Sequence, residues 1–210
     1  MIALGLDTTG AWCTAALVDE HKIMAQISKK IGRGHAERLA PMVNELLSKA
    51  GVTPNQIDRI AVCSGPGSFT GLRVALAFAK SFALPRKIPV TGFSALELMA
   101  MEADPKKDRR VLSLMDVRRG ELCWALYENG SEVIAPKTQA IDGAITDIKT
   151  LEYDMIVGNG AGLIGATSDI DHVSGSVLAD AALSYTPHER PVIPVYSRPP
   201  DAKLPGGKSL

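Results

Sequence analysis

The sequence predicts an α/β protein of two lobes, each built as three strands, a helix, a strand and a helix. Short apolar runs separated by polar hairpin turns come in sets of three, which indicates antiparallel strands. Segments with a helical apolar period follow each set, and helices of this kind cover the faces of a sheet. A length of 210 residues is enough for two such lobes.

The first half follows this order from its first residue. Leu39, Val43 and Leu46 give one helix an apolar face, and Gly51 can end it. Pro41 cannot donate a main-chain N–H, so this helix is expected to start just before Pro41 or to kink there. Strands are expected at 1–6, 12–18, 23–27, 57–63 and 88–92, and helices at 35–50, 68–84 and 94–103. The last of these helices opens on 94–97, Ser-Ala-Leu-Glu, which fits a capping box.

The helix at 68–84 carries two stripes of side chains. Gly65, Pro66 and Gly67 form a turn before it, and Ser68 or Thr70 can cap it. No Gly-Lys-Ser/Thr follows, so this is not a Walker A loop. The loop is expected to be a plain tight turn; the alternative is that the free main-chain N–H groups at the start of the helix bind an anion. One stripe has small side chains, and the stripe beside it has bulkier ones. The small-residue stripe is expected either to pack inside the chain or to dock a partner chain. The small stripe is Gly71, Ala75, Ala79 and Ala83, and the bulkier stripe is Val74, Phe78 and Phe82.

The second half repeats the order after a polar break at 104–110. Strands are expected at 111–115, 121–127, 132–135 and 154–157, helices at 140–151 and 177–185, and a proline-rich tail at 191–210. We therefore predict lobes at 1–104 and 105–210. A duplicated βββαβα unit is the plan of the actin, Hsp70 and hexokinase (ASKHA) fold, in which nucleotide binds between the lobes.

Two segments are candidates for the wall of such a cleft. Asp7, Thr8 and Thr9 end a strand before a glycine and could face a nucleotide phosphate and its metal, or could simply form a turn. Gly158 and Gly160 belong to a glycine-rich loop after another strand. The spacing at 160–165 matches G-x-G-x-x-G, but no helical pattern follows, so a lining loop is favoured over a dinucleotide site.

Composition and the titratable residues exclude several function classes. The basic and acidic residues number 23 each, so no general nucleic-acid or membrane surface is predicted. The three cysteines are widely spaced in apolar runs, and no signal peptide pattern opens the chain, which favours a cytoplasmic protein. The histidines form no local metal-binding pair, and no nucleophile elbow occurs. A predicted hairpin carries Arg118, Arg119 and Glu121, where a solvated turn is favoured over a partner-binding role.

Five motifs together resemble a known family, the TsaB (YeaZ) family of bacterial tRNA threonylcarbamoyladenosine biosynthesis proteins. The glycine-rich motif is the most specific of them, and the resemblance spans nearly the whole chain. The motifs are Asp-Thr-Thr at 7–9, His-Ala-Glu-Arg-Leu-Ala-Pro at 35–41, Gly-Pro-Gly-Ser-Phe-Thr-Gly-Leu-Arg at 65–73, Asp-Val-Arg-Arg-Gly-Glu at 116–121 and Pro-Val-Tyr-Ser-Arg at 194–198.

The resemblance implies an actin-like fold and a role in placing threonylcarbamoyl on the adenosine beside the anticodon of tRNA. It implies a non-catalytic subunit that binds the transferase paralogue TsaD, joined by the P-loop ATPase TsaE, with a homodimer when TsaD is absent. Contact with tRNA is then indirect, no membrane is involved, and this chain requires no cofactor, although ATP or ADP can enter at the level of the complex. TsaD-like proteins were also described as glycoproteases.

The non-catalytic role can be compared with the sequence. The resemblance implies that TsaD-like enzymes hold their metal with two histidines just after an Ile-Pro-x-x-Gly segment. Here that segment is 88–92, and the matching positions are Ala95 and Met99, neither of which is a ligand for a hard metal. The final helix also looks short after Asp180.

The lobe that carries the helices at 35–50 and 68–84 is expected to bind the partner. Two other functions stay open: an actin-like ATPase, kinase or glycoprotease-like hydrolase acting on its own, and a peptidoglycan- or stress-related interaction protein with no tRNA role. The expected interface residues are Leu39, Val43, Leu46, Gly71, Val74, Ala75, Phe78, Ala79 and Phe82.

Overall fold

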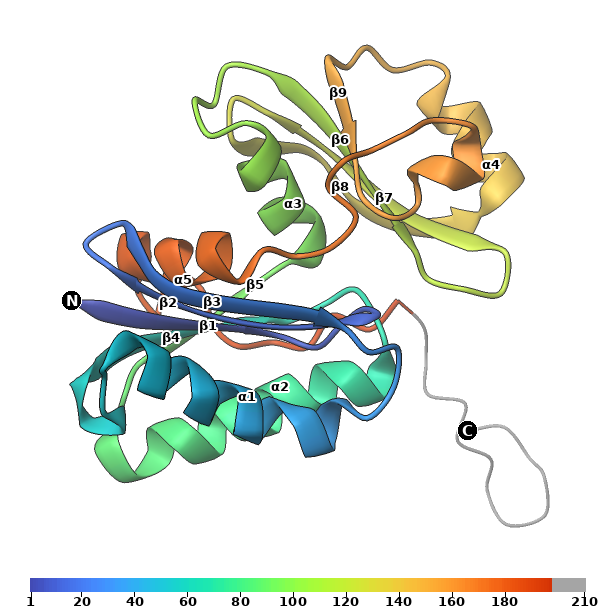
Figure 1. The fold of residues 1–210 in the computed structure, drawn as a ribbon. Helices are drawn as coiled ribbons and strands as arrows, with labels where there is room; N and C mark the ends of the chain where they lie inside the picture. Colours follow the sequence, from blue (N-terminus) through green and yellow to red (C-terminus); the bar gives the residue numbers. More distant parts are fainter. Residues whose placement is uncertain (198–210) are drawn as a thin grey trace, which may run out of the picture.

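The chain folds around two mixed β-sheets (Figure 1). A computed structural model describes residues 1–197. The first sheet has the order β3-β2-β1-β4-β5, in which β1, β2 and β3 are antiparallel and β4 and β5 join parallel to β1 and to each other. Its strands are β1 (Ile2–Asp7), β2 (Trp12–Asp19), β3 (Lys22–Lys30), β4 (Ile57–Cys63) and β5 (Val90–Phe93).

The second sheet repeats this pattern with one strand fewer. Its order is β8-β7-β6-β9, with antiparallel hairpins and β9 parallel to β6. The parallel pairs β1–β4 and β6–β9 are each reached through a helix, as parallel connections require. The predicted duplication is therefore visible in the sheets. The strands are β6 (Arg110–Asp116), β7 (Glu121–Glu128), β8 (Ser131–Ala140) and β9 (Met155–Val157).

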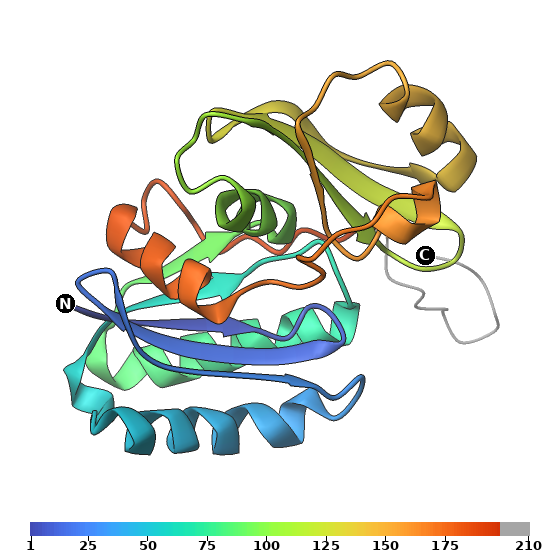
Figure 2. The same ribbon diagram turned by 45° about the horizontal axis from the view of Figure 1, so that its top comes forward.

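Helices and sheets alternate in layers (Figures 1 and 2). Helices α1 (His35–Ala50) and α2 (Phe69–Ala83) cover the outer face of the first sheet, and α4 (Ile141–Ile148) covers the outer face of the second. Between the sheets lie α3 (Ala95–Ala103), which packs on β6, β7 and β9, and α5 (Gly175–Ser184), which packs on β1, β2 and β4. Each sheet is thus covered by a helix from the other half of the chain.

Three apolar cores fill these layers. One lies between α1, α2 and the first sheet and contains Leu4, Leu39 and Leu72. A second, around Phe93 and Leu178, lies between the sheets and joins residues of both halves, and a third lies under α4. The division at residue 104 stays a prediction about folding units, because the middle core belongs to both halves.

Several local predictions need correction. Helix α1 has the expected bounds 35–50, so the alternative start just before Pro41 is wrong. The helix can include Pro41 because this residue lies on its exposed side, where the lost main-chain hydrogen bond costs least. Ser94 makes no side-chain cap on α3, so the predicted capping box is wrong; Glu97 instead pairs with Arg190. After β9 the chain forms the short 3₁₀ turns η3 (Ala161–Ile164) in the place that α2 occupies in the first lobe.

The remaining short segments are η1 (Pro54–Gln56) and η2 (Leu84–Arg86), which flank β4 and α2. Cys13, Cys63 and Cys123 are free thiols in the interior. Among residues 1–197, no helix combines the length and the apolar character that crossing a bilayer demands. Arg198 and the rest of the expected tail lie outside the described residues.

Candidate functional site

The Asp7-Thr8-Thr9 turn is fully buried and is occupied by internal contacts. The Asp7 carboxylate accepts hydrogen bonds from the Thr9 N–H at 2.9 Å and from the Thr9 hydroxyl at 2.7 Å. Burial raises the pKa of the Asp7 carboxyl above its ordinary value, and the bonds from Thr9 oppose that rise. The Thr8 hydroxyl donates to the Gly71 carbonyl at 2.6 Å. The Thr8 bond fastens the end of β1 to the start of α2, and the Thr9 bonds hold the turn itself.

Glycine at 67 and 71 permits that close approach. A Cβ added at Gly71 would lie 2.0 Å from the Thr8 carbonyl oxygen, and one at Gly67 would lie 2.5 Å from that of Thr9. Ser68 caps α2, because its hydroxyl accepts the Gly71 N–H at 3.3 Å. The glycine-rich motif is therefore a packing device here.

Gly158 and Gly160 play the same part in the second lobe. A Cβ at Gly158 would lie 1.9 Å from the Leu114 carbonyl oxygen, and Gly158 has a φ of +104°, which favours glycine. Gly160 donates its N–H to the same carbonyl at 3.2 Å. Both glycines hold the loop after β9 against β6.

A cavity of about 660 Å³ opens between the lobes beside these loops. Of the five candidate cleft residues, only Thr9 lines it; Asp7, Thr8, Gly158 and Gly160 do not. Nucleotide binding there stays a prediction. The rest of the lining comes from Gly10 and Ala11, the loop and helix start at 32–37, Gly67, Ser68, Thr70, Gly71 and Val74, the segment 115–118 and Asn159.

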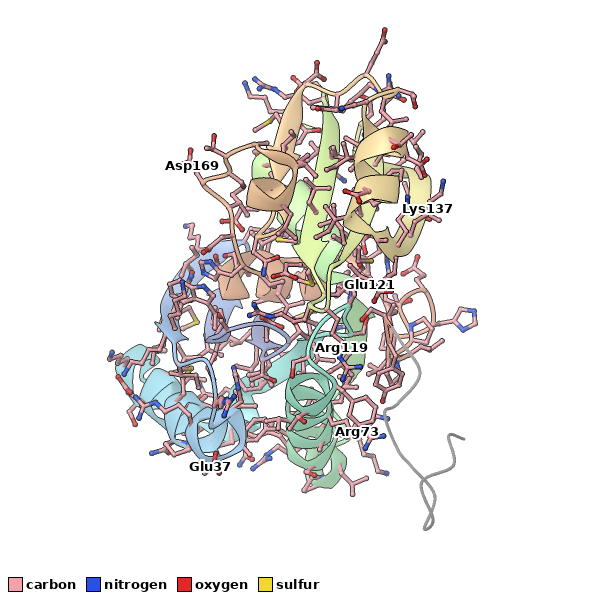
Figure 3. All side chains as sticks on the ribbon, turned by 90° about the vertical axis from the view of Figure 1, so that its right-hand side faces the viewer. Glu37, Arg73, Arg119, Glu121, Lys137 and Asp169 are labelled. Carbon is pink, nitrogen blue, oxygen red and sulfur yellow. The ribbon has the colours of Figure 1, made fainter. Side chains whose placement is uncertain are left out.

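The β6–β7 hairpin tip forms one wall of this cavity. Arg118 donates to the Asp116 carboxylate from its main chain at 2.7 Å and from its side chain at 3.4 Å. Arg119 and Glu121, labelled in Figure 3, lie above the start of α2, while Arg73 lies on its flank. The tip of the hairpin is thus held by hydrogen bonds between its own residues, Arg118 and Asp116, at the mouth of the cleft.

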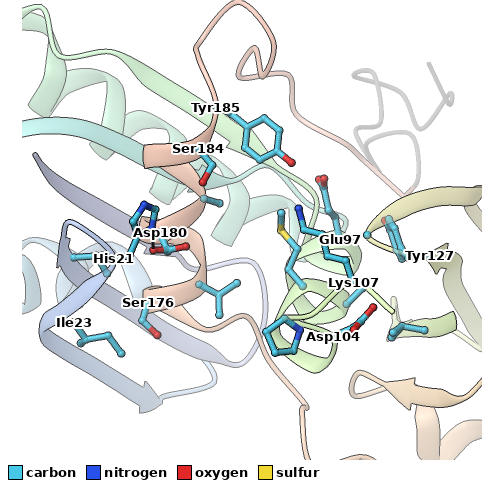
Figure 4. A pocket seen from close by; sticks show the side chains of 18 residues that line it. His21, Ile23, Glu97, Asp104, Lys107, Tyr127, Ser176, Asp180, Ser184 and Tyr185 are labelled. Atoms are coloured by element: carbon cyan, nitrogen blue, oxygen red, sulfur yellow. Dashed lines mark hydrogen bonds and ion pairs between the residues drawn. The ribbon is translucent and has the colours of Figure 1, made fainter. Parts of the chain in front are cut away.

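A second cavity of about 350 Å³ lies between α3 and α5, at the opposite ends of the strands (Figure 4). Its floor includes buried Val18, Val111 and Ala181. On its rim His21 Nδ1 lies 2.6 Å from the Asp180 carboxylate. The other acidic groups of its lining, Glu97 and Asp104, are also bonded within the chain, the first to Arg190 and the second to main-chain N–H groups.

The histidine positions implied for a metal lie in the middle core. Ala95 and Met99, both on α3, are fully buried among apolar side chains. Within residues 1–197, no group of three or more His, Cys, Asp or Glu side chains could hold a metal ion. His35, the first residue of α1, is buried, and its Nε2 lies 3.2 Å from the Trp12 carbonyl oxygen.

The expected interface residues divide into a buried and a half-exposed set. Ala75 and Ala79 are fully buried, so the small stripe of α2 packs inside the chain and cannot meet a partner. A bulky side chain at either position would therefore test packing, not docking. Val74, Phe78 and Phe82 are half-exposed. The other buried members are Leu39, Val43, Leu46 and Gly71.

The exposed side of α1 and α2 forms a shallow groove of about 460 Å³, which we call the α1–α2 groove. Phe78, which lines it, stacks on Phe82 with ring centroids 5.8 Å apart. Its lining is Ala36, Leu39, Phe69, Thr70, Arg73, Val74, Ala77 and Phe78.

Sequence reasoning missed Phe69 and Arg73 in this groove. The Arg73 guanidinium lies 3.8 Å from the centroid of the Phe69 ring. Their i, i+4 spacing at the start of α2 was the available signal, because such pairs share one helix face. The groove is therefore apolar along α2 and cationic at the start of that helix.

Comparison with known proteins assigns these features to a family. The family model of TsaD, described as tRNA N6-adenosine threonylcarbamoyltransferase, matches residues 22–159. The tRNA threonylcarbamoyladenosine biosynthesis protein TsaB of Escherichia coli (strain K12) is 30% identical over 91% of this chain and 94% of that protein. TsaB of Bacillus subtilis (strain 168) is 31% identical over 61% of this chain and 56% of that protein.

Solved structures agree with this assignment. YeaZ from Pseudomonas aeruginosa superimposes with a TM-score of 0.77 at 25% identity, covering 93% of this chain and 100% of that chain. The ethanolamine utilization protein EutJ from Carboxydothermus hydrogenoformans shares the fold, with a TM-score of 0.53 at 13% identity over 87% of this chain and 89% of that chain. The predicted actin-like (ASKHA) fold is confirmed.

Proposed function

Since the chain belongs to the TsaB (YeaZ) family of tRNA threonylcarbamoyladenosine biosynthesis proteins, we propose that it serves this modification as a non-catalytic subunit. Its task is to bind a TsaD-family transferase and support threonylcarbamoyl transfer to the adenosine beside the anticodon. The site of this action is the cytoplasm, where the tRNA substrate is found, and the contact with tRNA is made by the assembled complex.

The α1–α2 groove is the observation that carries this proposal. Two long helices stand side by side on the outer face of the first sheet, and half-exposed Val74, Phe78 and Phe82 run along them. Apolar side chains that remain accessible in one stripe mark an interaction surface, whereas single exposed ones are ordinary. Aromatic anchors such as Phe78 contribute most to the affinity of such surfaces.

The match to the TsaD family model suggests how the partner fits. The matched residues 22–159 include both helices of the groove, so a TsaD-family partner carries counterparts of α1 and α2. Two related helix pairs can then pack face to face about a pseudo-twofold axis. Two copies of this chain would use the same surface when TsaD is absent, which makes the homodimer and the heterodimer exclusive.

The interior supports a non-catalytic role. Ala95 and Met99 occupy the positions where the family resemblance places metal-binding histidines, and both are buried among apolar side chains. Asp7, the acidic residue expected to face a nucleotide, does not line the cavity and is bonded to Thr9 in the interior. TsaE, the ATPase of the same system, joins at the level of the complex and brings the nucleotide.

A second candidate function is nucleotide binding in the inter-lobe cavity. Its volume of about 660 Å³ and the polar residues Thr9, Ser68 and Thr70 in its lining favour this candidate. Calorimetric titration of the chain with ATP and Mg²⁺ measures it directly. Binding with hydrolysis would point to an actin-like ATPase acting alone, and the absence of heat would leave the accessory role.

The level of threonylcarbamoyladenosine in tRNA tests the proposed function. Depleting this chain in its own organism should lower the modified nucleoside, measured by mass spectrometry of digested tRNA, and the wild-type gene should restore it. The Val133→Asp variant, changed at an exposed side chain of the second lobe, should restore it equally well. A normal level after depletion would contradict the proposal and favour an interaction protein with no tRNA role.

A further inference from the structure

The last described segment, residues 190–196, runs as an irregular strap along the open edge of the first sheet. The Gly92 N–H donates to the Arg190 carbonyl at 3.0 Å, and the Val195 N–H donates to the Ser64 carbonyl at 2.7 Å. Gly65 and Gly92 admit the strap, since a Cβ at Gly65 would lie 2.4 Å from the Val195 carbonyl oxygen. We call this segment the strap.

A shielded ion pair anchors the start of the strap. The Arg190 guanidinium contacts both carboxylate oxygens of Glu97, at 2.7 and 3.1 Å, and the exposed fraction of Glu97 is only 15%. The same guanidinium lies 4.5 Å from the ring centroid of Tyr185. Bidentate pairs of this kind fix orientation as well as position. The strap is therefore held at both ends.

The outer side of the strap is apolar. Ile193, Val195 and Tyr196 are exposed by 62%, 40% and 39%. The edge strand β5 exposes unpaired main-chain N–H and C=O groups, and the main chain of the strap alone is enough to cover them. That role does not explain three large apolar side chains that face outward.

The strap leads into the α1–α2 groove. The Tyr196 ring lies 5.1 Å from the Phe69 ring, and Phe69 in turn lies under the Arg73 guanidinium. Phe69 and Arg73 both line the groove. A continuous surface therefore runs from Phe78, through Phe69 and Arg73, to the strap.

Arg73 gives this surface a positive charge that favours an anionic group on the partner. Its guanidinium is exposed, and no carboxylate of residues 1–197 lies within ion-pair distance of it. Stacking on Phe69 fixes the cation in place, which reduces the entropy lost when it binds an anion. A partner that covers the groove would therefore have to supply an acidic group beside Arg73.

We propose that the strap is part of the docking surface, so that the partner closes on Tyr196, Phe69 and Arg73 together and places a carboxylate on Arg73. This inference rests on the proposed function, because the partner is the TsaD-family chain that covers the α1–α2 groove. It adds a third segment, which begins at Arg190, 107 residues after the end of α2 at Ala83, to a surface otherwise built from two helices.

Affinity for the TsaD protein of the same organism, measured by titration calorimetry, tests this inference. Tyr196→Ala should weaken binding at least about tenfold, as expected for a central aromatic anchor. Arg73→Glu should weaken it more than Arg73→Gln, and that difference should shrink at high salt. The matched control is Tyr153→Ala, a tyrosine exposed by 37% in the second lobe, which should bind like the wild type.

The outcomes separate the strap from the proposed function. A wild-type complex whose affinity is unchanged by Tyr196→Ala and by Arg73→Glu would overturn the role of the strap and leave the groove intact. A wild-type chain that forms no complex would overturn both. Thermal unfolding of Tyr196→Ala alone, which should match the wild type because the side chain is exposed, excludes loss of folding as the cause.

Discussion

The two lobes share a sheet plan and differ in the helices that cover it. In the first lobe the helices after β3 and β4 are α1 and α2, of 16 and 15 residues. In the second lobe the corresponding segments are α4, of 8 residues, and η3, of 4. The short segments close the core under α4, whereas the long pair also presents an apolar groove to the outside.

This difference shows where fold and function are encoded. In both lobes a glycine that follows the fourth strand packs against the first strand or its end, Gly71 against Thr8 just after β1 and Gly158 against Leu114 of β6. That packing is a requirement of the fold and recurs in both. The exposed sides of α1 and α2 have no counterpart in the second lobe, so we assign partner binding to the first lobe.

Gly71→Val should have the largest effect of the changes considered. Its branched side chain would meet the main chain of Thr8, which cannot move without displacing β1, and we expect a loss of more than about 4 kcal/mol in the free energy of unfolding. Denaturant titration measures this loss. Gly162→Val in the second lobe is the control, because nothing lies within 4 Å of a Cβ there. Equal stability of the two variants would show that the Gly71 contact is not required.

Phe78→Asp should abolish partner binding while sparing the fold. The side chain is only partly buried at the edge of the core and lines the groove, so a charge there can reach water in the free chain but is desolvated in the complex. A loss of about 2–4 kcal/mol in binding free energy is expected from an aromatic anchor. Surface plasmon resonance against TsaD measures it.

The corresponding change in the second lobe is Val133→Asp, at a side chain exposed by 48%. It should leave the affinity for TsaD unchanged. If Val133→Asp weakened binding as much as Phe78→Asp, the second lobe would belong to the interface and the contrast between the lobes would be lost.

Asp7→Asn should have a smaller effect that depends on pH. Burial raises the pKa of Asp7 in the folded chain, so this group costs stability once the pH rises through that raised value and costs none below its ordinary value of 3.8. Asparagine keeps an oxygen for Thr9 without the charge. The variant should therefore be more stable than the wild type at neutral pH, and this advantage should shrink as the pH falls.

Denaturant midpoints from pH 4 to 8 measure this trend. Asp169→Asn, at an exposed position, is the control and should follow the wild type throughout. An Asp7→Asn advantage that grew on acidification would contradict the assignment of a buried, destabilising carboxylate at the end of β1.

Local signals in the sequence predicted much of the first lobe. Helix α1 and strand β4 have the expected bounds, because Gly51 and the apolar run at 57–63 mark them locally. The placement of α5 on the first sheet and the pairing of Glu97 with Arg190 were not predicted, since both join segments far apart in the sequence. The small stripe of α2 shows the same limit: periodicity identified one helix face but not whether it points inward.

Of the candidate site, the sequence predicted the helix pair, but only three of the nine expected interface residues remain partly accessible. Val74, Phe78 and Phe82 are accessible as expected, whereas Ala75 and Ala79 are not. Tyr196 could not be placed beside Phe69 from the sequence, because the contact depends on how the strap crosses the glycines at 65 and 92.

Light scattering on a sizing column measures whether the α1–α2 groove binds TsaD. The chain is run alone, then mixed with TsaD of its own organism, and the Phe78→Asp variant is run in the same way. We expect a new peak with the mass of a one-to-one complex, replacing any homodimer, and no such peak with the variant. Separate elution of the wild-type chain and TsaD at every salt and nucleotide condition would show that this chain is not a TsaD-binding subunit.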